Sequence, residues 1–148
     1  MDTGANSIEP SILECRVGEN NMIYLRMGGD ITMSILGVPE KFERWASDVR
    51  AAMMHVSVSN NGYVLTLIDV TEMAQFDLAI ISRIRELMEF NKQYATKTAV
   101  FGATSWVSMV VRSTLALTGR TNMRIFSERD EALTWLAESE SNEKIVEK

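Results

Sequence analysis

The hydrophobic pattern changes period repeatedly along the chain, and this alternation constrains the fold more than any other feature. Apolar and polar residues alternate with period two in 11–17 and 22–27, and the polar loop between them favours a β-hairpin. Three later segments are short apolar runs typical of covered strands: 63–70, 98–101 and 123–126. Segments with a helical period of about 3.6 residues separate and follow these runs. The pattern predicts an α/β domain with a mostly parallel five-stranded sheet, an N-terminal antiparallel hairpin strand and four helices.

The predicted helices have recognisable ends. The first begins at Pro39, a residue tolerated in the first helical turn, and ends near His55. The second spans about 77–94, and the third spans 105–117, with Gly119 as its C′ glycine. Ser127 is the expected N-cap of the fourth, with Asp130 completing a capping-box spacing. The residues expected on the buried faces of the first two helices are Phe42, Trp45, Ala46, Val49 and Met53, then Ile81, Ile84 and Met88.

Length and charge bound the kind of protein. A chain of 148 residues fits one domain, expected at 11–137, with a loose lead-in at 1–10 and a charged tail at 138–148. The N-terminus does not read as a signal peptide, and the weakly polar stretch 99–111 falls short of the ~20 apolar residues of a spanning helix. A net charge of −5 without a basic cluster argues against nucleic-acid binding. We therefore expect a soluble, cytoplasmic protein.

Residues for catalysis or metal binding are scarce. The lone cysteine, Cys15, excludes an internal disulfide, fits a reducing compartment, and shares the parity of a core-facing strand position. The one histidine, His55, is best explained as a half-buried residue near the C-terminal end of a helix. Residues 102–105 resemble a phosphate-binding turn only superficially, since the lysine and the glycine spacing are missing. We expect no catalytic residue, no metal site and no cofactor.

A ligand or partner is expected where parallel strands end, because binding sites of open α/β sheets form at that edge. The polar residues predicted there are Asp69, Thr71, Asp77, Thr104 and Ser105. The competing interpretation is that Asp77, Thr104 and Ser105 are N-caps, each worth ~1 kcal/mol.

The third predicted helix is unusually apolar. Its only charged residue is Arg112, and its main stripe consists of Val107, Val110, Val111 and Leu117. Trp106 and Met109 lie away from that stripe, with the small Ser113 and Ala116 beside them. Neighbouring helices would cover these side chains in one interpretation. In the other, a second subunit or a ligand does, and we expect a homodimer through Trp106, Met109, Val110 and Ser113.

Three segments in this order resemble the STAS domain of anti-sigma-factor antagonists and sulfate transporters, and in particular its stand-alone SpoIIAA-like branch. They are Leu25–Thr32 (LRMGGDIT), Leu67–Thr71 (LIDVT) and Met123–Leu136 (MRIFSERDEALTWL). The last matches the branch's terminal phrase at Phe126, Ala132, Trp135 and Leu136. The likeness covers residues 11–137 and implies the STAS fold.

One departure from the resemblance bears on function. STAS antagonists carry a phosphorylatable serine at the start of the second helix, whereas this chain has Asp77-Leu78-Ala79-Ile80, and Ser82 lies more than a turn beyond Asp77. The resemblance thus implies a binding domain without the phosphorylation switch. Its kinship with CRAL-TRIO domains implies a lipid or other small ligand.

Three interpretations of function remain open. The first is a non-enzymatic, STAS-like regulatory module that binds a protein through its strand-end loops. The second is a carrier or sensor of a small apolar ligand such as a fatty acid, weakly supported by ten adaptable methionines. The third is an enzyme with an unrecognised site.

Overall fold

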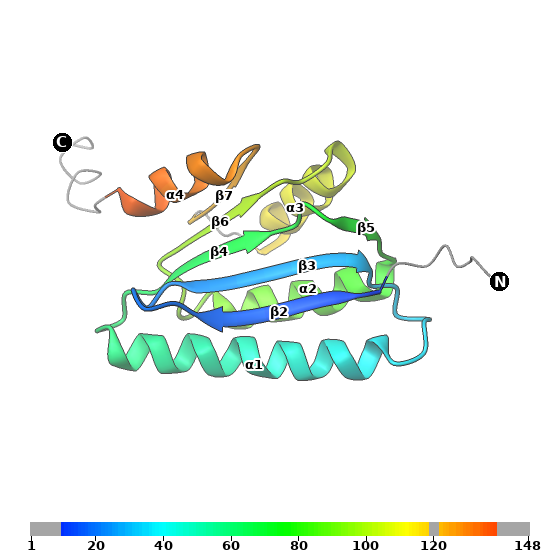
Figure 1. Cartoon of the computed structure of the whole chain (residues 1–148), viewed down its shortest axis with the longest axis horizontal. Coiled ribbons are helices and arrows are strands. Elements are labelled where there is room, and N and C mark those ends of the chain that lie inside the picture. The colour runs from blue at the N-terminus through cyan, green and yellow to red at the C-terminus, as the bar shows by residue number, and fades with distance from the viewer. Residues whose placement is uncertain (1–9, 119–121, 139–148) are drawn as a thin grey trace.

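The sheet is mostly parallel, with one antiparallel edge strand. The computed structural model describes residues 10–118 and 122–138. Strand β2 (Ile12–Val17) pairs antiparallel with β3 (Ile23–Asp30). The parallel strands β4 (Leu65–Asp69), β6 (Lys97–Phe101) and β7 (Met123–Phe126) follow, so that the order across the sheet is β2-β3-β4-β6-β7 (Figure 1). The predicted fold class is confirmed.

A sixth strand, β5 (Met73–Gln75), was not predicted. It pairs in parallel with the end of β3, where the backbone N–H of Gly29 donates to Glu72 O at 2.8 Å and that of Ile31 to Gln75 O at 3.0 Å. Three residues are too few to show a period of two, so the hydrophobic pattern carried no signal for this strand. The pairing also explains why β3 continues beyond Met27, where the alternation predicted its end.

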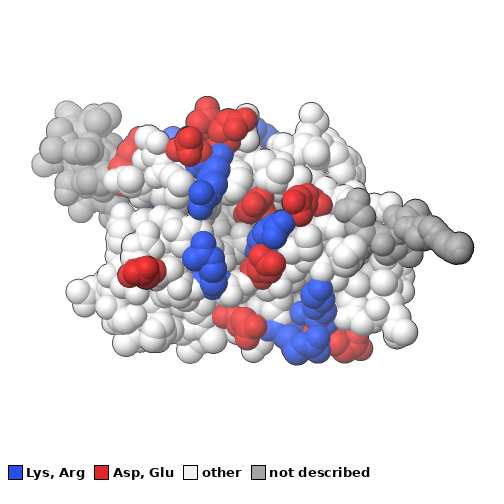
Figure 2. All heavy atoms as spheres, in the orientation of Figure 1, with Lys and Arg blue, Asp and Glu red and all other residues white. Residues whose placement is uncertain are grey.

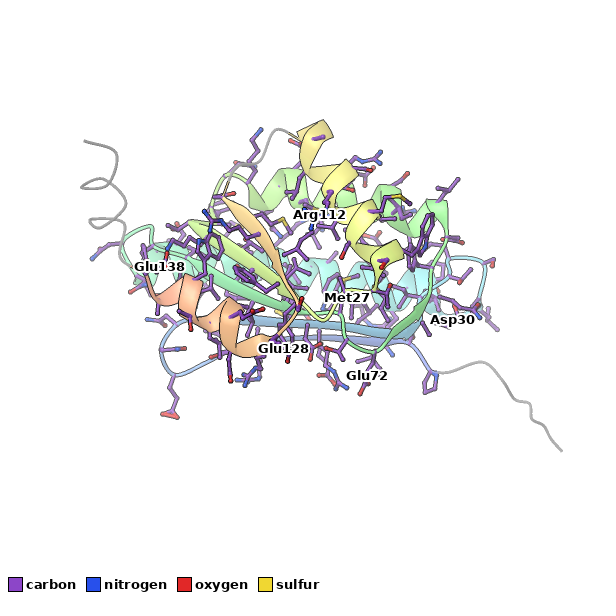
Figure 3. The ribbon with its side chains drawn as sticks, turned by 90° about the horizontal axis from the view of Figure 1, so that it is seen from above. Met27, Asp30, Glu72, Arg112, Glu128 and Glu138 are labelled. Atoms are coloured by element: carbon purple, nitrogen blue, oxygen red, sulfur yellow. The ribbon has the colours of Figure 1, made fainter. Side chains whose placement is uncertain are left out.

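Three helices cover one face of the sheet and one covers the other. Helices α1 (Val38–Ser59), α2 (Leu78–Asn91) and α3 (Ser105–Thr118) share a core with Ile23, Leu25 and Met27 of β3. Helix α4 (Arg129–Ala137) packs on Leu67, Ala99 and Phe101 from the opposite face. Figure 3 shows the two layers, with Arg112 of α3 on one side of the sheet and Glu128, just before α4, on the other.

Helix α1 buries the predicted stripe and also protects the sheet edge. Phe42, Trp45, Ala46, Val49 and Met53 are all buried. The indole Nε1 of Trp45 donates to Glu14 O at 2.9 Å, and Lys41 Nζ donates to Ser11 O. These bonds occupy carbonyl groups in and beside β2 that would otherwise be free to pair with another strand.

Several predicted helix details differ from the structure. Helix α1 continues to Ser59, and His55 is exposed rather than half-buried. The N-cap of α4 is Glu128 instead of Ser127, because Glu131 lies at its N3 position and accepts from the Glu128 N–H at 3.2 Å. The expected cap Gly119 lies outside the described residues. The buried residues of α2 are Ile80, Leu87, Met88 and Asn91. Of the predicted stripe, Met88 is therefore buried, whereas Ile81 and Ile84 are only partly covered.

Candidate functional site

The predicted strand-end residues act mainly as turn and helix caps. Asp69 Oδ1 accepts from the Thr71 N–H at 2.8 Å, and Thr104 Oγ1 accepts from the Val107 N–H at 3.3 Å. Thr71 and Ser105 are exposed. The side chain of Thr71 packs closely over Gly102, where a Cβ atom would lie 2.3 Å from Thr71 Oγ1. These contacts support the capping interpretation for Thr104 and hold the loop after β4 against the loop after β6.

Asp77 has two structural roles. Its Oδ1 caps α2 by accepting from the Ile80 N–H at 3.0 Å, and its Oδ2 accepts from the Met33 N–H at 3.1 Å. The second bond fixes the loop between β3 and α1 beside the start of α2. Asp69 instead lines a hollow on the α4 side of the sheet. The Asp69 and Asp77 carboxylates therefore contact different parts of the molecule and do not form one site.

Large apolar side chains are exposed near these loops. Leu36 is 100% exposed, Leu78 81%, Trp106 57% and Met109 52%. The ring of Trp106 stacks on Phe76, with centroids 6.2 Å apart and planes inclined by 19°. We call Leu36, Phe76, Leu78, Trp106 and Met109 the apolar rim. Its members come from the segments that follow the carboxyl ends of three parallel strands, namely the loop between β3 and α1, the chain after β5 and the start of α3 after β6.

Only part of this rim is predicted by the sequence. Trp106 and Met109 were predicted as surplus apolar residues, and the described part of the chain leaves both exposed. Leu36 and Leu78 were missed because they stand outside any periodic stripe, one in a loop and the other in the first turn of α2.

Helix α3 buries few of its described side chains against the sheet. Among its described side chains, those of residues 105–116, only Val107 and Thr114 are buried. Val110 and Val111 are partly covered, and the exposed Ser113 donates from Oγ to Met109 O at 2.9 Å. Leu117, the last member of the predicted stripe, has a side chain outside the described part.

A small apolar cavity lies between α2, α3 and the sheet. Its walls include Ile68, Val100, Ile81, Ile84 and Val107, and its volume is about 70 Å³. Pockets that enclose small ligands usually measure ~300–1,000 Å³. The cavity is too small for a fatty-acid chain, and this geometry lends the apolar-ligand interpretation no support.

The described residues offer little for catalysis or metal binding. No group of three or more His, Cys, Asp or Glu side chains in 10–118 and 122–138 is arranged to hold a metal ion. His55 projects from the exposed side of α1. Within the same ranges, no helix is both long enough and apolar enough to span a membrane.

Cys15 is expected to be an unreactive thiol. It packs against the main core from β2, and burial, together with the nearby Asp48 carboxylate, raises its pKa from 9.0 to about 11. Near pH 8 this shift lowers the thiolate fraction by about 100-fold relative to an unperturbed thiol, and only the thiolate is nucleophilic. We expect slow reaction with Ellman's reagent in the native protein and rapid reaction in denaturant. Equal rates in both conditions would contradict the prediction.

The same raised pKa predicts how stability changes with pH. The unfolded state releases the Cys15 proton first, near its ordinary pKa of 9.0, whereas the folded state keeps it up to about 11. Stability from this group is therefore complete below pH 9.0 and declines as the pH rises toward about 11. A Cys15→Ala variant in urea unfolding at several pH values should lack this decline.

Comparison with known proteins places the chain among related folds. A family model described as SpoIIAA-like matches residues 23–137. An uncharacterized protein of the DUF3478 family with a SpoIIAA-like fold, from Shewanella loihica, superimposes with a TM-score of 0.60 at 17% identity, covering 90% of this chain and 98% of that one. An anti-sigma-factor antagonist (STAS) domain protein from Planctomyces limnophilus superimposes with a TM-score of 0.56 at 16% identity, covering 85% and 98%. No curated protein matches significantly.

Proposed function

The chain belongs to the SpoIIAA-like family, and from this premise we propose that it is a non-enzymatic regulatory module that binds protein through its apolar rim. The family match and the two structural neighbours confirm the resemblance that the sequence motifs indicated. The observation that carries the proposal is the exposure of Leu36, Leu78, Trp106 and Met109 around one edge of the sheet. Exposed apolar side chains gathered in this way are typical of protein–protein contacts.

A switch by phosphorylation is not part of the proposed function. The start of α2 presents Asp77, Leu78, Ala79 and Ile80, and none of these side chains has a hydroxyl group. Asp77 is already engaged by the Met33 and Ile80 N–H groups, and Leu78 occupies the adjacent surface. We infer that an apolar contact at this position takes the place of a phosphate-dependent one.

The occupant that we propose for the rim is a second copy of the chain. Helix α3 carries one charge, Arg112, so its surface has no charge pattern that would select a different partner. Ser113 and Ala116, both small and exposed on α3, allow a second helix to approach closely. Two-fold pairing of a self-complementary apolar patch is the commonest way to cover such a surface.

Multi-angle light scattering tests this association. At tens of micromolar we expect a mass of twice 16.7 kDa for the native chain. Trp106→Glu should weaken the dimer at least about tenfold, because it places a charge in a desolvated contact. Val58→Glu is the matched control, since Val58 is also an apolar helix residue and is 84% exposed on α1.

The possible outcomes separate the alternatives. A monomeric native chain at these concentrations ends the homodimer proposal. A dimer that survives Trp106→Glu but is lost with Val58→Glu moves the interface away from the rim. An adduct of lipid mass in native mass spectrometry of freshly purified protein would favour the small-ligand function instead.

A further inference from the structure

The face of the sheet that carries α4 is only partly covered. In Figure 1, β2 and β3 lie toward the viewer with no described helix in front of them, whereas α4 packs on β4, β6 and β7 at the other end of the sheet. Strand register arranges the side chains on this open face in two rows. One row runs Arg16, Tyr24, Leu67, and the next runs Glu14, Arg26, Asp69, Phe101. Figure 2 shows basic and acidic side chains gathered over the middle of this face.

A hollow of about 380 Å³ lies over these rows. Its lining includes the partly exposed Tyr24, the buried Leu67 and Phe101 at its base, and Arg129, the first residue of α4. This volume falls within the ~300–1,000 Å³ typical of small-ligand sites, unlike the cavity beneath α3. The hollow is thus large enough for a small molecule and has an apolar base.

The acidic side chains around the hollow are concentrated on one arginine. Arg26 Nη2 lies 2.6 Å from Glu72 Oε1, and Arg26 Nη1 lies 3.6 Å from Glu14 Oε1. The Glu72 carboxylate, with smaller contributions from Glu14 and Asp69, raises the pKa of Arg26. Figure 3 shows Glu72 on the same side of the sheet as Glu128, the residue before Arg129. Glu14 and Glu72 are thus paired with Arg26 and not with Arg16 or Arg129, the other two arginines at the hollow.

Arg16 and Arg129 form no ion pair with any described residue. The Arg16 guanidinium carbon lies 4.1 Å from the centroid of the Tyr24 ring, a cation–π contact that orients the group at the margin of the hollow. A guanidinium presents several N–H donors in a plane and binds carboxylate or phosphate in a bidentate manner. Two such groups line the same hollow and have the chemistry that binds an anion, in a protein whose net charge is −5.

We propose that the open-face hollow binds a small organic anion, with a carboxylate or phosphate held by Arg16 and Arg129 and a flat apolar body lying against the partly exposed Tyr24, above the buried Leu67 and Phe101. The site lies on the opposite face of the sheet from α3 and does not depend on the proposed association through the apolar rim.

Titration of the uniformly ¹⁵N-labelled full chain with 2-naphthoate, followed by amide NMR spectra, tests the site. This probe combines a carboxylate with a flat apolar ring, and 2-naphthylmethanol is its neutral counterpart. We expect saturable shifts at β2, β3 and the start of α4, and binding at least about tenfold weaker for the neutral compound. The double variant Arg16→Gln/Arg129→Gln should weaken naphthoate binding by a similar factor or more.

Arg112→Gln is the matched control, because Arg112 is an exposed arginine on the opposite face of the sheet. It should leave the affinity unchanged. Equal affinity for the two probes, shifts confined to α3 and the apolar rim, or undiminished binding by the double variant with native-like spectra would each overturn the proposal. Failure to bind either probe at millimolar concentration would do the same, whatever the oligomeric state.

Discussion

Replacing Phe42 with alanine is expected to lower the free energy of unfolding by about 3–5 kcal/mol, the usual cost of truncating a fully buried phenylalanine. Phe42 is among the largest fully buried side chains, and its ring packs against Trp45 at a centroid distance of 5.4 Å. Its loss would leave a cavity between α1 and the sheet and would loosen the helix that protects β2. Because domains of this size are stable by only ~5–15 kcal/mol, the variant should be close to unfolding.

Urea denaturation followed by circular dichroism measures this effect. Val58→Ala is the control on the same helix, because Val58 is 84% exposed and its truncation should change stability by less than about 0.5 kcal/mol. If Phe42→Ala lowered the free energy of unfolding no more than Val58→Ala does, Phe42 would not be buried between α1 and the sheet.

Replacing Lys97 with alanine is expected to lower the free energy of unfolding by about 3 kcal/mol. The loss comes from its charge-assisted hydrogen bonds and from the packing of its methylene groups. Lys97 is only 3% exposed, although it is a lysine in a strand. Its Nζ donates to Trp135 O at 3.1 Å and to Glu138 O at 2.8 Å, and it lies 5.1 Å from the centroid of the Trp135 ring. The ammonium group thus satisfies carbonyls at the C-terminal end of α4, where a cation also favours the helix dipole.

Lys97→Met is the informative partner variant, because it keeps most of the volume and removes the donors. We expect Lys97→Met to lower the free energy of unfolding by about half as much as Lys97→Ala. The difference between the two variants measures the contribution of packing. Trp135 emission should shift to longer wavelength in the alanine variant as the end of α4 loosens. Two variants as stable as the native chain would show that the carbonyls of α4 find other partners.

These two residues also mark the limits of prediction from sequence. Phe42 belongs to a stripe with period 3.6, and its burial follows from that pattern alone. Lys97 stands directly before an apolar run, and the hydrophobic pattern predicted a strand that begins at residue 98, whereas β6 begins at Lys97. A lysine at that position is buried only because α4 crosses the opposite face and ends above it, and local sequence does not encode that contact.

The candidate sites divide in a similar way. Asp77 and Thr104 were recognised as possible caps because capping depends on neighbours within three residues. The apolar rim joins residues 36, 76, 78, 106 and 109, and the open-face hollow joins residues 16, 24, 26, 67, 101 and 129. In both cases the members are brought together from separate elements by strand register and by the return of helices to the sheet.

The α/β class, the order of most elements and the buried face of α1 were determined by the sequence, because hydrophobic period and turn chemistry act over a few residues. The tertiary structure alone decided that Leu36 and Leu78 stay uncovered, that β5 pairs with β3, and that the carboxylates around the hollow gather on Arg26 rather than on Arg16 or Arg129. These outcomes depend on distances between segments remote in the chain, and such distances are set only when the layers pack.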